Sequence, residues 1–483
     1  MIRHLVQLLC ILLICLSLVQ CAVNPVTGKK ELMFVSESQE ISMGKELYPS
    51  ALWGDVGGGG EFRDDQLHAY LRDIVLQIHG VSHRPNLPVD FAIQNSSVPN
   101  AWAIPGHVVI TRGLLAGLGN EAEFVFVMGH EMGHVAARHS ARQMTYGLLQ
   151  QVGLGAASVA LSGSDYANMA LGVGSVGSSL LLLKYSRNDE LEADRLGIEY
   201  MARLGYDPLY AISAHRNLEK ISGEYLESLG KKTQERGFFE DLLSTHPRTS
   251  VRIDELQMMI NRLPKVKIEG DGAYRERFQN RTAGLRDTNR IYLKYYDPAV
   301  QAYEKNRLDE AGDLIEQALE QDRRQPAFLT LKGFILLKSK DYAAAKKSFQ
   351  AAMDVDKDFA PAYRGMGIVS YNQKKYREGI DYLNWSLSLL PQDALSHYFL
   401  GMSYFMMNDY TSSVPHLKAF AEVQPKHPEI HGRLGISYEQ SGDVSAAYQS
   451  YVQQVNVAPD NEMGRHAASR IAALRPALRE QKR

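Results

Sequence analysis

The sequence predicts a mainly α protein in two parts: an N-terminal α+β domain with a short sheet, followed by an α-solenoid. Three observations predict this organisation. Glycine, proline and tyrosine recur at one fixed interval in the C-terminal part, two short β-branched runs stand in the N-terminal part, and a long apolar helical pattern follows those runs. With 483 residues the chain is also too long for a single hydrophobic core, so separate domains are expected.

The first 21 residues, MIRHLVQLLCILLICLSLVQC, predict a targeting signal. Their apolar run, Leu5–Val19, is shorter than the ~20 residues that span a membrane and matches the apolar core of a secretory signal. Because the run leads to Cys21, the segment resembles a bacterial lipoprotein signal, in which that cysteine is lipidated and Ala22 favours the outer membrane. We therefore expect a periplasmic protein that is lipid-anchored to the outer membrane. Gln20, in place of a small residue, leaves a simple secretory signal or an uncleaved anchor as alternatives.

The rest of the chain lacks cysteine and carries little net charge. All three cysteines lie in the first 21 residues, so no disulfide, thiolate metal site or cysteine nucleophile is expected after them. The net charge is −2, which gives no electrostatic reason to expect nucleic acid as a partner. With 45% hydrophobic residues, the chain has enough apolar side chains to build globular cores rather than disordered or fibrous structure.

Residues 22–263 predict a mixed domain of helices and strands. LPVDFAIQ (Leu87–Gln94) and HVVIT (His107–Thr111) are short β-branched runs bounded by proline or glycine, as strands are. Gly147–Leu183 is rich in small and apolar residues and carries a single charge, Asp165. We expect this segment to be a mobile helix–loop beside the active site, with a pair of membrane-dipping helices as the alternative.

The C-terminal part repeats with a period of 34 residues. Three residue types keep this interval: Gly333, Gly367, Gly401 and Gly435; Pro391, Pro425 and Pro459; Tyr342, Tyr376 and Tyr410. The period is that of tetratricopeptide repeats, in which a small residue stands where two helices cross. We expect about five repeats, the first degenerate, and a capping helix over residues 461–482, all within a repeat domain at 291–483. Residues 264–290 are polar and predict a linker, and the repeats predict a groove for a partner that the sequence does not identify.

The motif GHEMGH starts at Gly129 and lies on the apolar helical pattern. Residues four apart lie on one face of a helix, so His130 and His134 can share one metal ion. Glu131 lies one step around the helix, where it can reach a water bound to that ion. Gly129 and Gly133 are also four apart and each costs stability in a helix, which suggests that another element or a substrate packs closely there.

YSRNDELEADRLG (Tyr185–Gly197) offers the missing ligand. Glu190 and Asp194 are four apart and share a helix face, whereas Glu192 points about 200° away. The Glu190 carboxylate completes a His2Glu zinc site with the fourth position left for water. Asp194 can hold a ligand histidine by its second ring nitrogen. Taken alone, this stretch also suits a solvated charged helix.

GHEMGHVAARH, SRNDELEADRLG, NAWAIPGHVVITRGLL and the early NPVTGKKEL together resemble the Ste/Oma-type zinc endopeptidases, metallopeptidase family forty-eight. The likeness runs through most of residues 24–263 and implies a zincin-type domain of the gluzincin kind with one zinc ion per chain. It assigns His130, His134 and Glu190 to the metal, with Glu131 as base and Asp194 as supporting acid. It assigns Asn100, Ala101, Trp102 and Ala103 to the strand that lines the substrate cleft. His107 stands where the family usually has a second glycine.

Two further histidines have open roles. His139 lies nine positions after His130, on the opposite side of a continuous helix, so we expect a structural or surface histidine there. STHPRTSVRI (Ser244–Ile253) also resembles a family element, which implies that His246 stabilises the oxyanion or fills the fourth zinc position. A surface histidine is the alternative for His246. Arg252, in the helix that follows, is a candidate for supporting the metal ligands.

Together these features predict a zinc metalloendopeptidase that cleaves unfolded or misassembled envelope proteins in outer-membrane protein quality control. The repeat domain would hold the client, or an outer-membrane assembly machine, close to the active site. A repeat-based chaperone or adaptor with little proteolytic activity is one alternative, and an integral membrane protease with Gly147–Leu183 inserted is another. Glu131 beside the predicted ligands favours the enzyme, because a binding module has no use for a base.

Overall fold

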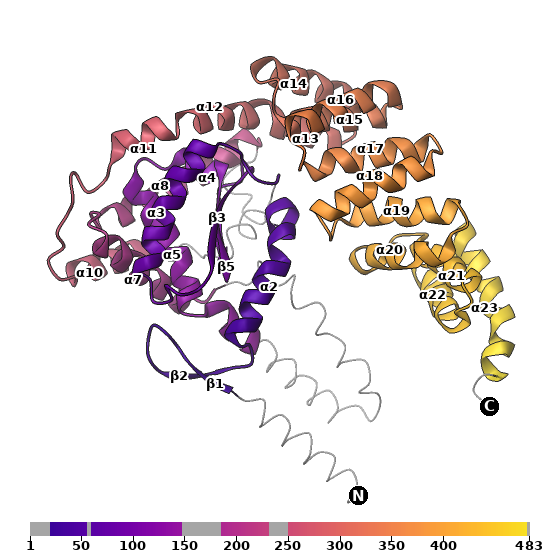
Figure 1. The fold of residues 1–483 in the computed structure, drawn as a ribbon, viewed down its shortest axis with the longest axis horizontal. Helices are drawn as coiled ribbons and strands as arrows, with labels where there is room; N and C mark the ends of the chain where they lie inside the picture. The colour runs from indigo at the N-terminus through magenta and orange to yellow at the C-terminus, as the bar shows by residue number, and fades with distance from the viewer. Residues whose placement is uncertain (1–19, 56–58, 147–184, 231–249, 481–483) are drawn as a thin grey trace, which may run out of the picture. The chain divides into compact units, whose positions relative to one another are not determined.

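The computed structural model describes residues 20–55, 59–146, 185–230 and 250–480 (Figure 1). The predicted signal up to residue 19, the segment Gly147–Leu183 and His246 lie outside these residues. The chain divides into two compact units, Met1–Lys294 and Tyr295–Arg483. None of the helices in the described part combines the length with the apolar character that a membrane crossing requires.

A three-stranded mixed sheet lies in the first unit, in the order β3–β5–β4. β3 (Val89–Gln94) runs parallel to the central strand β5 (Gly106–Thr111), and β4 (Ala101–Ile104) pairs antiparallel with the other side of β5. Both strands predicted from the β-branched runs are therefore confirmed. Gly106 has a φ of 101°, which glycine adopts readily, and it permits the tight turn from β4 to β5.

The two faces of the sheet pack against different helices (Figure 1). Because side chains alternate along a strand, Ile93 faces the core that α3 (Asp65–Val81) and α5 (Glu121–Ala136) also build. Trp102 faces the opposite side, where it packs with residues of α2 (Glu37–Ser50). Coverage on both faces explains why the strands are nearly continuous apolar runs rather than alternating ones.

α5 is buried along almost its whole length and carries the GHEMGH motif. The Asn120 side chain accepts a hydrogen bond from the Glu123 N–H group and caps the first turn. α7 (Arg187–Arg203) and α8 (Tyr210–Ser228) pack against α5 from its remaining sides. A helix surrounded in this way needs apolar residues all round, which is the pattern that the sequence has from residue 124 to 128.

Shorter elements complete the first unit. They are the hairpin of β1 (Gln20–Val23) and β2 (Lys30–Met33), the π-helical turn η1 (Ala51–Asp55), α4 (Arg112–Gly117), α10 (Ser250–Asn261), α11 (Arg275–Arg281) and α12 (Ala283–Ile291). α11 and most of α12 lie in residues 264–290, the segment predicted as a linker. Phe278 of α11 and Leu285 of α12 are buried in the same core as α5, and the polar residues occupy the outer faces of these two helices. This segment is therefore packed.

The second unit consists of packed helix pairs followed by a single helix. After the π-helical turn η4 (Tyr292–Tyr296) come α13 (Asp297–Glu304) with α14 (Leu308–Gln321), α15 (Pro326–Lys338) with α16 (Tyr342–Val355), α17 (Ala360–Asn372) with α18 (Tyr376–Leu389), α19 (Ala394–Met406) with α20 (Tyr410–Val423), α21 (Ile430–Gln440) with α22 (Val444–Val457), and finally α23 (Glu462–Glu480). The predicted solenoid of tetratricopeptide repeats is confirmed in this described stretch.

The glycine period has a packing reason. Each periodic glycine lies against the side chain 16 positions later, and these side chains are Phe349, Leu383, Leu417 and Tyr451. A Cβ atom on Gly367 would lie 2.5 Å from the Leu383 Cγ atom, which is closer than two carbon atoms can approach. A larger residue at any of these positions would therefore push the two helices of a pair apart.

The turns inside the helix pairs keep the same interval. Asn306, Lys340, Lys374, Asn408 and Gly442, each 34 positions after the last, all have positive φ angles between 60° and 92°. The series extends the repeat to the first pair, α13 and α14, where the periodic glycine is replaced by the buried Ala299. The first repeat is therefore degenerate in its crossing residue but regular in its turn.

Acid should destabilise the second unit through His416. Its Nδ1 atom is 3.0 Å from the Nδ1 atom of His397, and burial together with that neighbour lowers the pKa of the His416 imidazole to about 4. Between pH 6.5 and 4 the unfolded chain binds a proton there that the folded chain does not, so stability falls as the pH falls. We expect a loss of about 1–2 kcal/mol between pH 7 and pH 5, after allowance for solvent screening. Denaturant unfolding at both pH values should show it, and His416→Gln should reduce it.

Candidate metal centre

α5 and α7 approach each other closely at glycine residues. A Cβ atom on Gly129 would lie 3.2 Å from the Gly197 Cα atom, and one on Gly133 would lie 3.2 Å from the Ala193 Cα atom. Gly129 and Gly133, which suggested close packing, therefore allow the backbone of α7 to lie directly against α5. This contact brings the histidines of α5 and Glu190 of α7 to one place.

The three residues predicted as ligands converge there. His130 Nε2 and His134 Nε2 are 3.1 Å apart, and they lie 3.6 Å and 3.4 Å from the two carboxylate oxygens of Glu190. Ligand atoms about 2.0–2.2 Å from a tetrahedral ion are separated from one another by roughly 3.3–3.6 Å. All three side chains are buried. The donor atoms and their spacing therefore fit a single divalent ion.

Burial keeps both imidazoles in the form that binds metal. It lowers the pKa of His130, against the opposing effects of Asp194 and Glu190, and it lowers the pKa of His134 well below the usual value, against the opposing effect of Glu190. A neutral imidazole has a free lone pair on one nitrogen, whereas an imidazolium has none. Both histidines are thus neutral at neutral pH and need lose no proton to act as ligands.

Asp194 supports His130 from behind. Its Oδ1 atom is 2.8 Å from His130 Nδ1, which leaves Nε2 facing the other ligands. Arg252 of α10 donates hydrogen bonds to both Asp194 oxygens and lies 2.8 Å from Glu190 Oε2. Burial opposes the ionisation of Asp194, but Arg252, the hydrogen bond with His130 and the nearby His215 hold its pKa well below the usual value. Both carboxylates therefore contact one buried guanidinium.

His139 supports His134 in the same way. α5 ends at Ala136, and Arg138 then adopts a positive φ of 57°, which turns the chain back toward the helix. His139 is 0% exposed, with its Nδ1 atom 2.8 Å from His134 Nδ1 and its Nε2 atom 3.1 Å from Glu192 Oε2. A structural histidine was expected at this position, but its contact with a ligand was not. Glu192, predicted to point away from Glu190, does so and meets His139 instead.

Glu131 lies next to His130 on α5 and is buried. Tyr185, just before α7, stacks on the His134 ring with centroids 3.9 Å apart, and its hydroxyl group is 2.9 Å from Ser140 Oγ. Burial raises the pKa of Tyr185, so its hydroxyl group stays protonated. Sequence reasoning missed Tyr185 and also His215 of α8, whose Nε2 atom is 3.5 Å from Asp194 Oδ1. Tyr185 opens the second charged motif but an aromatic residue there gives no sign of a contact with His134, and His215 belongs to no spaced motif.

The predicted substrate strand is β4, which lies at one edge of the three-stranded sheet. Asn100 precedes β4, and its N–H group donates to Thr111 Oγ1 at 2.9 Å. Ala101 and Ala103 face the core shared with α5, whereas Trp102 faces α2 and donates to Gln94 Oε1 at 3.2 Å. The Trp102 side chain therefore fixes the strand from behind rather than facing the metal centre.

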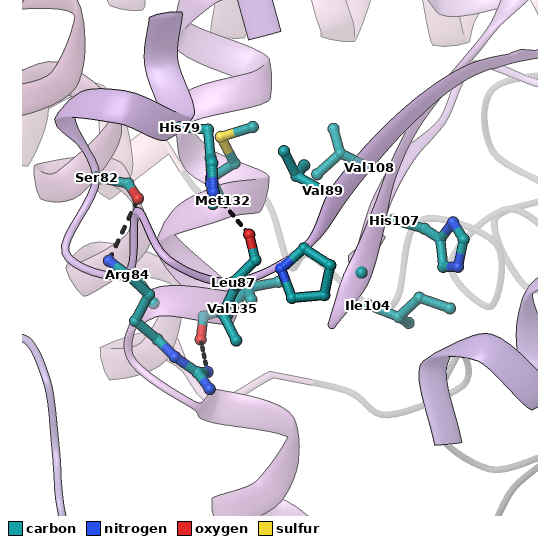
Figure 2. A pocket seen from close by; sticks show the side chains of 13 residues that line it. His79, Ser82, Arg84, Leu87, Val89, Ile104, His107, Val108, Met132 and Val135 are labelled. Atoms are coloured by element: carbon teal, nitrogen blue, oxygen red, sulfur yellow. Dashed lines mark hydrogen bonds between the residues drawn. The ribbon is translucent and has the colours of Figure 1, made fainter. Parts of the chain in front are cut away.

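A small cavity of about 20 Å³ lies where the end of β4 and the starts of β3 and β5 meet the C-terminal part of α5 (Figure 2). Met132 and Val135 of α5 line it together with His79, Leu87 and His107. Met132 is two positions from His130 and so faces roughly the opposite side of the helix. This volume suits about one water molecule. None of the three proposed ligands lines this cavity, so it does not belong to the metal centre.

Comparisons with known proteins agree with both halves of this description. Residues 62–260 match Peptidase family M48, and residues 326–359 and 398–459 match the tetratricopeptide repeat. The β-barrel assembly-enhancing protease of Yersinia pestis is 27% identical over 313 residues, which are 60% of this chain and 62% of that protein. Its counterpart in Escherichia coli K12 is 27% identical over 323 residues, 62% of this chain and 63% of that protein. The chain thus spans about three fifths of these relatives. The mitochondrial metalloendopeptidase OMA1 of Arabidopsis thaliana is 31% identical over 215 residues, 44% of this chain and 40% of that protein.

Proposed function

We propose that this chain, which joins a Peptidase family M48 domain to tetratricopeptide repeats, is a zinc-dependent endopeptidase. One observation carries the proposal: the Nε2 atoms of His130 and His134 and the carboxylate of Glu190 meet at distances that suit one divalent ion. Glu131 stands beside them. A binding scaffold would gain nothing from burying these four groups together, because each costs desolvation energy when it is buried.

Zinc is the metal that the donor set favours. Two imidazoles and one carboxylate form the protein part of many catalytic zinc sites, and the fourth position is left for water. The bound ion would lower the pKa of that water toward ~7 and polarise a substrate carbonyl. Asp194 and His139 hold the two imidazoles by their second ring nitrogens. These two hydrogen bonds fix the tautomers and orient both rings before any substrate binds.

Glu131 is the proposed general base. Its position one step around α5 from His130 sets its carboxylate beside the ligand atoms rather than among them. From there it would take a proton from the attacking water and return it to the leaving amine. Asp194 acts only through His130 and Arg252, and so positions the ligands. His246, which lies outside the described residues, stays a proposal as an oxyanion or fourth-position group.

The proposed substrates are unfolded or misassembled proteins. An extended segment could add as a further strand beside β4, the outer strand of the sheet, with Asn100 and Ala101–Ala103 as its proposed partners. A folded helix has no free backbone groups for such pairing, so the site would select unfolded segments. The repeat unit would bind the client or an assembly machine and raise its concentration near the site.

We place the protein in the periplasm, lipid-anchored to the outer membrane through Cys21. The apolar run before Cys21 supports this proposal, and so does the likeness to relatives named β-barrel assembly-enhancing proteases. A role in outer-membrane protein quality control is the function that fits both. The repeat array also supports the second candidate, an adaptor or chaperone with little proteolytic activity.

Removing the metal tests the enzyme proposal. Purified protein should cleave a denatured, fluorescently labelled protein, and a strong chelator should abolish the cleavage because the site loses its ion. One molar equivalent of Zn²⁺ should restore the activity, whereas Mg²⁺ should not, because Mg²⁺ prefers oxygen ligands. Cleavage that persists in chelator would refute the zinc assignment. A zinc-bound protein that cuts no unfolded substrate would favour the adaptor instead.

A further inference from the structure

The second ring nitrogens of the two histidine ligands have different partners. His130 meets a carboxylate, Asp194, whereas His134 meets another imidazole, His139. For His134 Nε2 to bind a metal, its proton must sit on Nδ1 and be donated to His139 Nδ1. His139 must then carry its own proton on Nε2, which faces Glu192 Oε2 at 3.1 Å. Metal binding at His134 Nε2 and the hydrogen-bond geometry thus determine both tautomers. Glu192 is the acceptor at the end of this series of hydrogen bonds.

This arrangement depends on the end of α5. Arg84 donates to the Val135 carbonyl group at 2.9 Å, and Arg138, the residue with positive φ, donates to the Val35 carbonyl group at 2.8 Å. Both arginines also donate to the buried carboxylate of Glu40 on α2. The sequence has no proline or glycine directly after Ala136, so these contacts are what ends the helix there. They place His139 back against His134.

The N-terminal hairpin contacts the segment on both sides of His139, at Ala137 and at Arg142. The Asn24 amide donates to Glu31 at 2.9 Å and lies 3.4 Å from the Ala137 carbonyl oxygen. Arg142, one turn after His139, lies 3.6 Å from Glu31 and also pairs with Asp189 of α7. The NPVTGKKEL motif has no role in the proposed chemistry. Its Glu31 contacts Arg142, and Arg142 pairs with Asp189, a carboxylate that lies 3.7 Å from His139 Nε2.

We propose that His139 is the positioning residue of the second metal ligand and that the β1–β2 hairpin fixes it through Glu31 and Arg142. The inference rests on the proposed metal site, and it extends that site to a motif about a hundred residues away in the sequence. Glu192 Oε2, which lies 3.1 Å from His139 Nε2, accepts the last hydrogen bond of this series. Loss of such outer partners weakens metal binding by about 10–100-fold in known sites.

Zinc affinity of the full-length protein, measured by competition with a chelating dye, tests the proposal. His139→Ala should weaken binding about 10–100-fold, and His139→Gln, which keeps an acceptor for His134 Nδ1–H, should recover most of the loss. Glu192→Gln and Glu31→Gln should each weaken binding several-fold. Glu199→Gln is the matched control, because it lies on the same helix and is 27% exposed against 20% for Glu192. It should leave the affinity unchanged.

Two further measurements separate positioning from a purely structural role. The visible spectrum of the Co²⁺-loaded protein should change in His139→Ala, because the geometry around the ion changes. Adding Glu31→Gln to His139→Ala should cost no further affinity, because the hairpin acts through the residue already lost. If His139→Ala only lowers the melting temperature of metal-free protein and keeps wild-type affinity, the inference is wrong and the zinc site stands. If wild-type protein binds no zinc, the proposed function fails and this inference fails with it.

Discussion

Replacing Glu131 by glutamine is expected to abolish cleavage of an unfolded protein while zinc stays bound. The amide has the size of the carboxylate but cannot accept a proton from the attacking water. General bases contribute about 10²–10⁴-fold to rates, so kcat/KM for a labelled unfolded substrate should fall by at least about 10²-fold. Metal analysis of the same sample should still find one zinc ion per chain, because Glu131 is not among the three converging donors.

Two variants make this result specific. Glu131→Asp keeps the charge but shortens the side chain, so it should retain part of the activity. Glu190→Gln should lose both metal and activity, because it removes a donor rather than the base. If Glu131→Gln cuts as fast as wild type, another group acts as base and the assignment of Glu131 is wrong.

Arg252→Met should produce the largest loss of stability. The guanidinium lies between Glu190 and Asp194, and all three side chains are at most 4% exposed. Burial works against the charge on Arg252, but the two carboxylates raise its pKa above the usual value. Methionine fills similar space and leaves two buried carboxyl groups without this partner. Removing one member of a buried ion pair costs about 3–5 kcal/mol, so the unfolding free energy of metal-free protein should fall by that amount.

Zinc provides the control for this prediction. A divalent ion at Glu190 replaces part of the lost positive charge, so denaturant unfolding with excess zinc should show a smaller loss than unfolding in chelator. Arg252→Lys keeps the charge but cannot bridge both carboxylates, and it should fall between Arg252→Met and wild type. A variant Arg252→Met as stable as wild type in chelator would contradict this prediction.

The predictable parts of this protein are those that depend on spacing along the chain. The 34-residue register predicted the solenoid because each glycine packs within its own helix pair. His130 and His134 could be placed on one face because four positions make about one helical turn. Glu190 could be paired with them only through the second charged motif.

The remaining features depend on contacts between distant segments. Nothing near Ala136 signals a helix end, since no proline or glycine follows it, and the end is imposed by Arg84 and by the pairing of Arg138 with Glu40. The contact of His139 with His134 follows from that end and could not be foreseen on a continuous helix. The polar residues of 264–290 gave no sign that Phe278 and Leu285 would join the core.

The backbone contact between α5 and α7 has a consequence for the geometry of the metal site. At Gly129, Gly133 and Gly197 the two helices meet mainly through main-chain atoms, with the Leu196 Cβ atom and the Phe126 ring beside them. The distance between the helix that carries the two histidines and the helix that carries Glu190 is therefore set by contacts between main-chain atoms. A side chain at any of the three glycines would push α5 and α7 apart and move the histidines away from Glu190, so residues that donate no electron pair set the spacing of those that do.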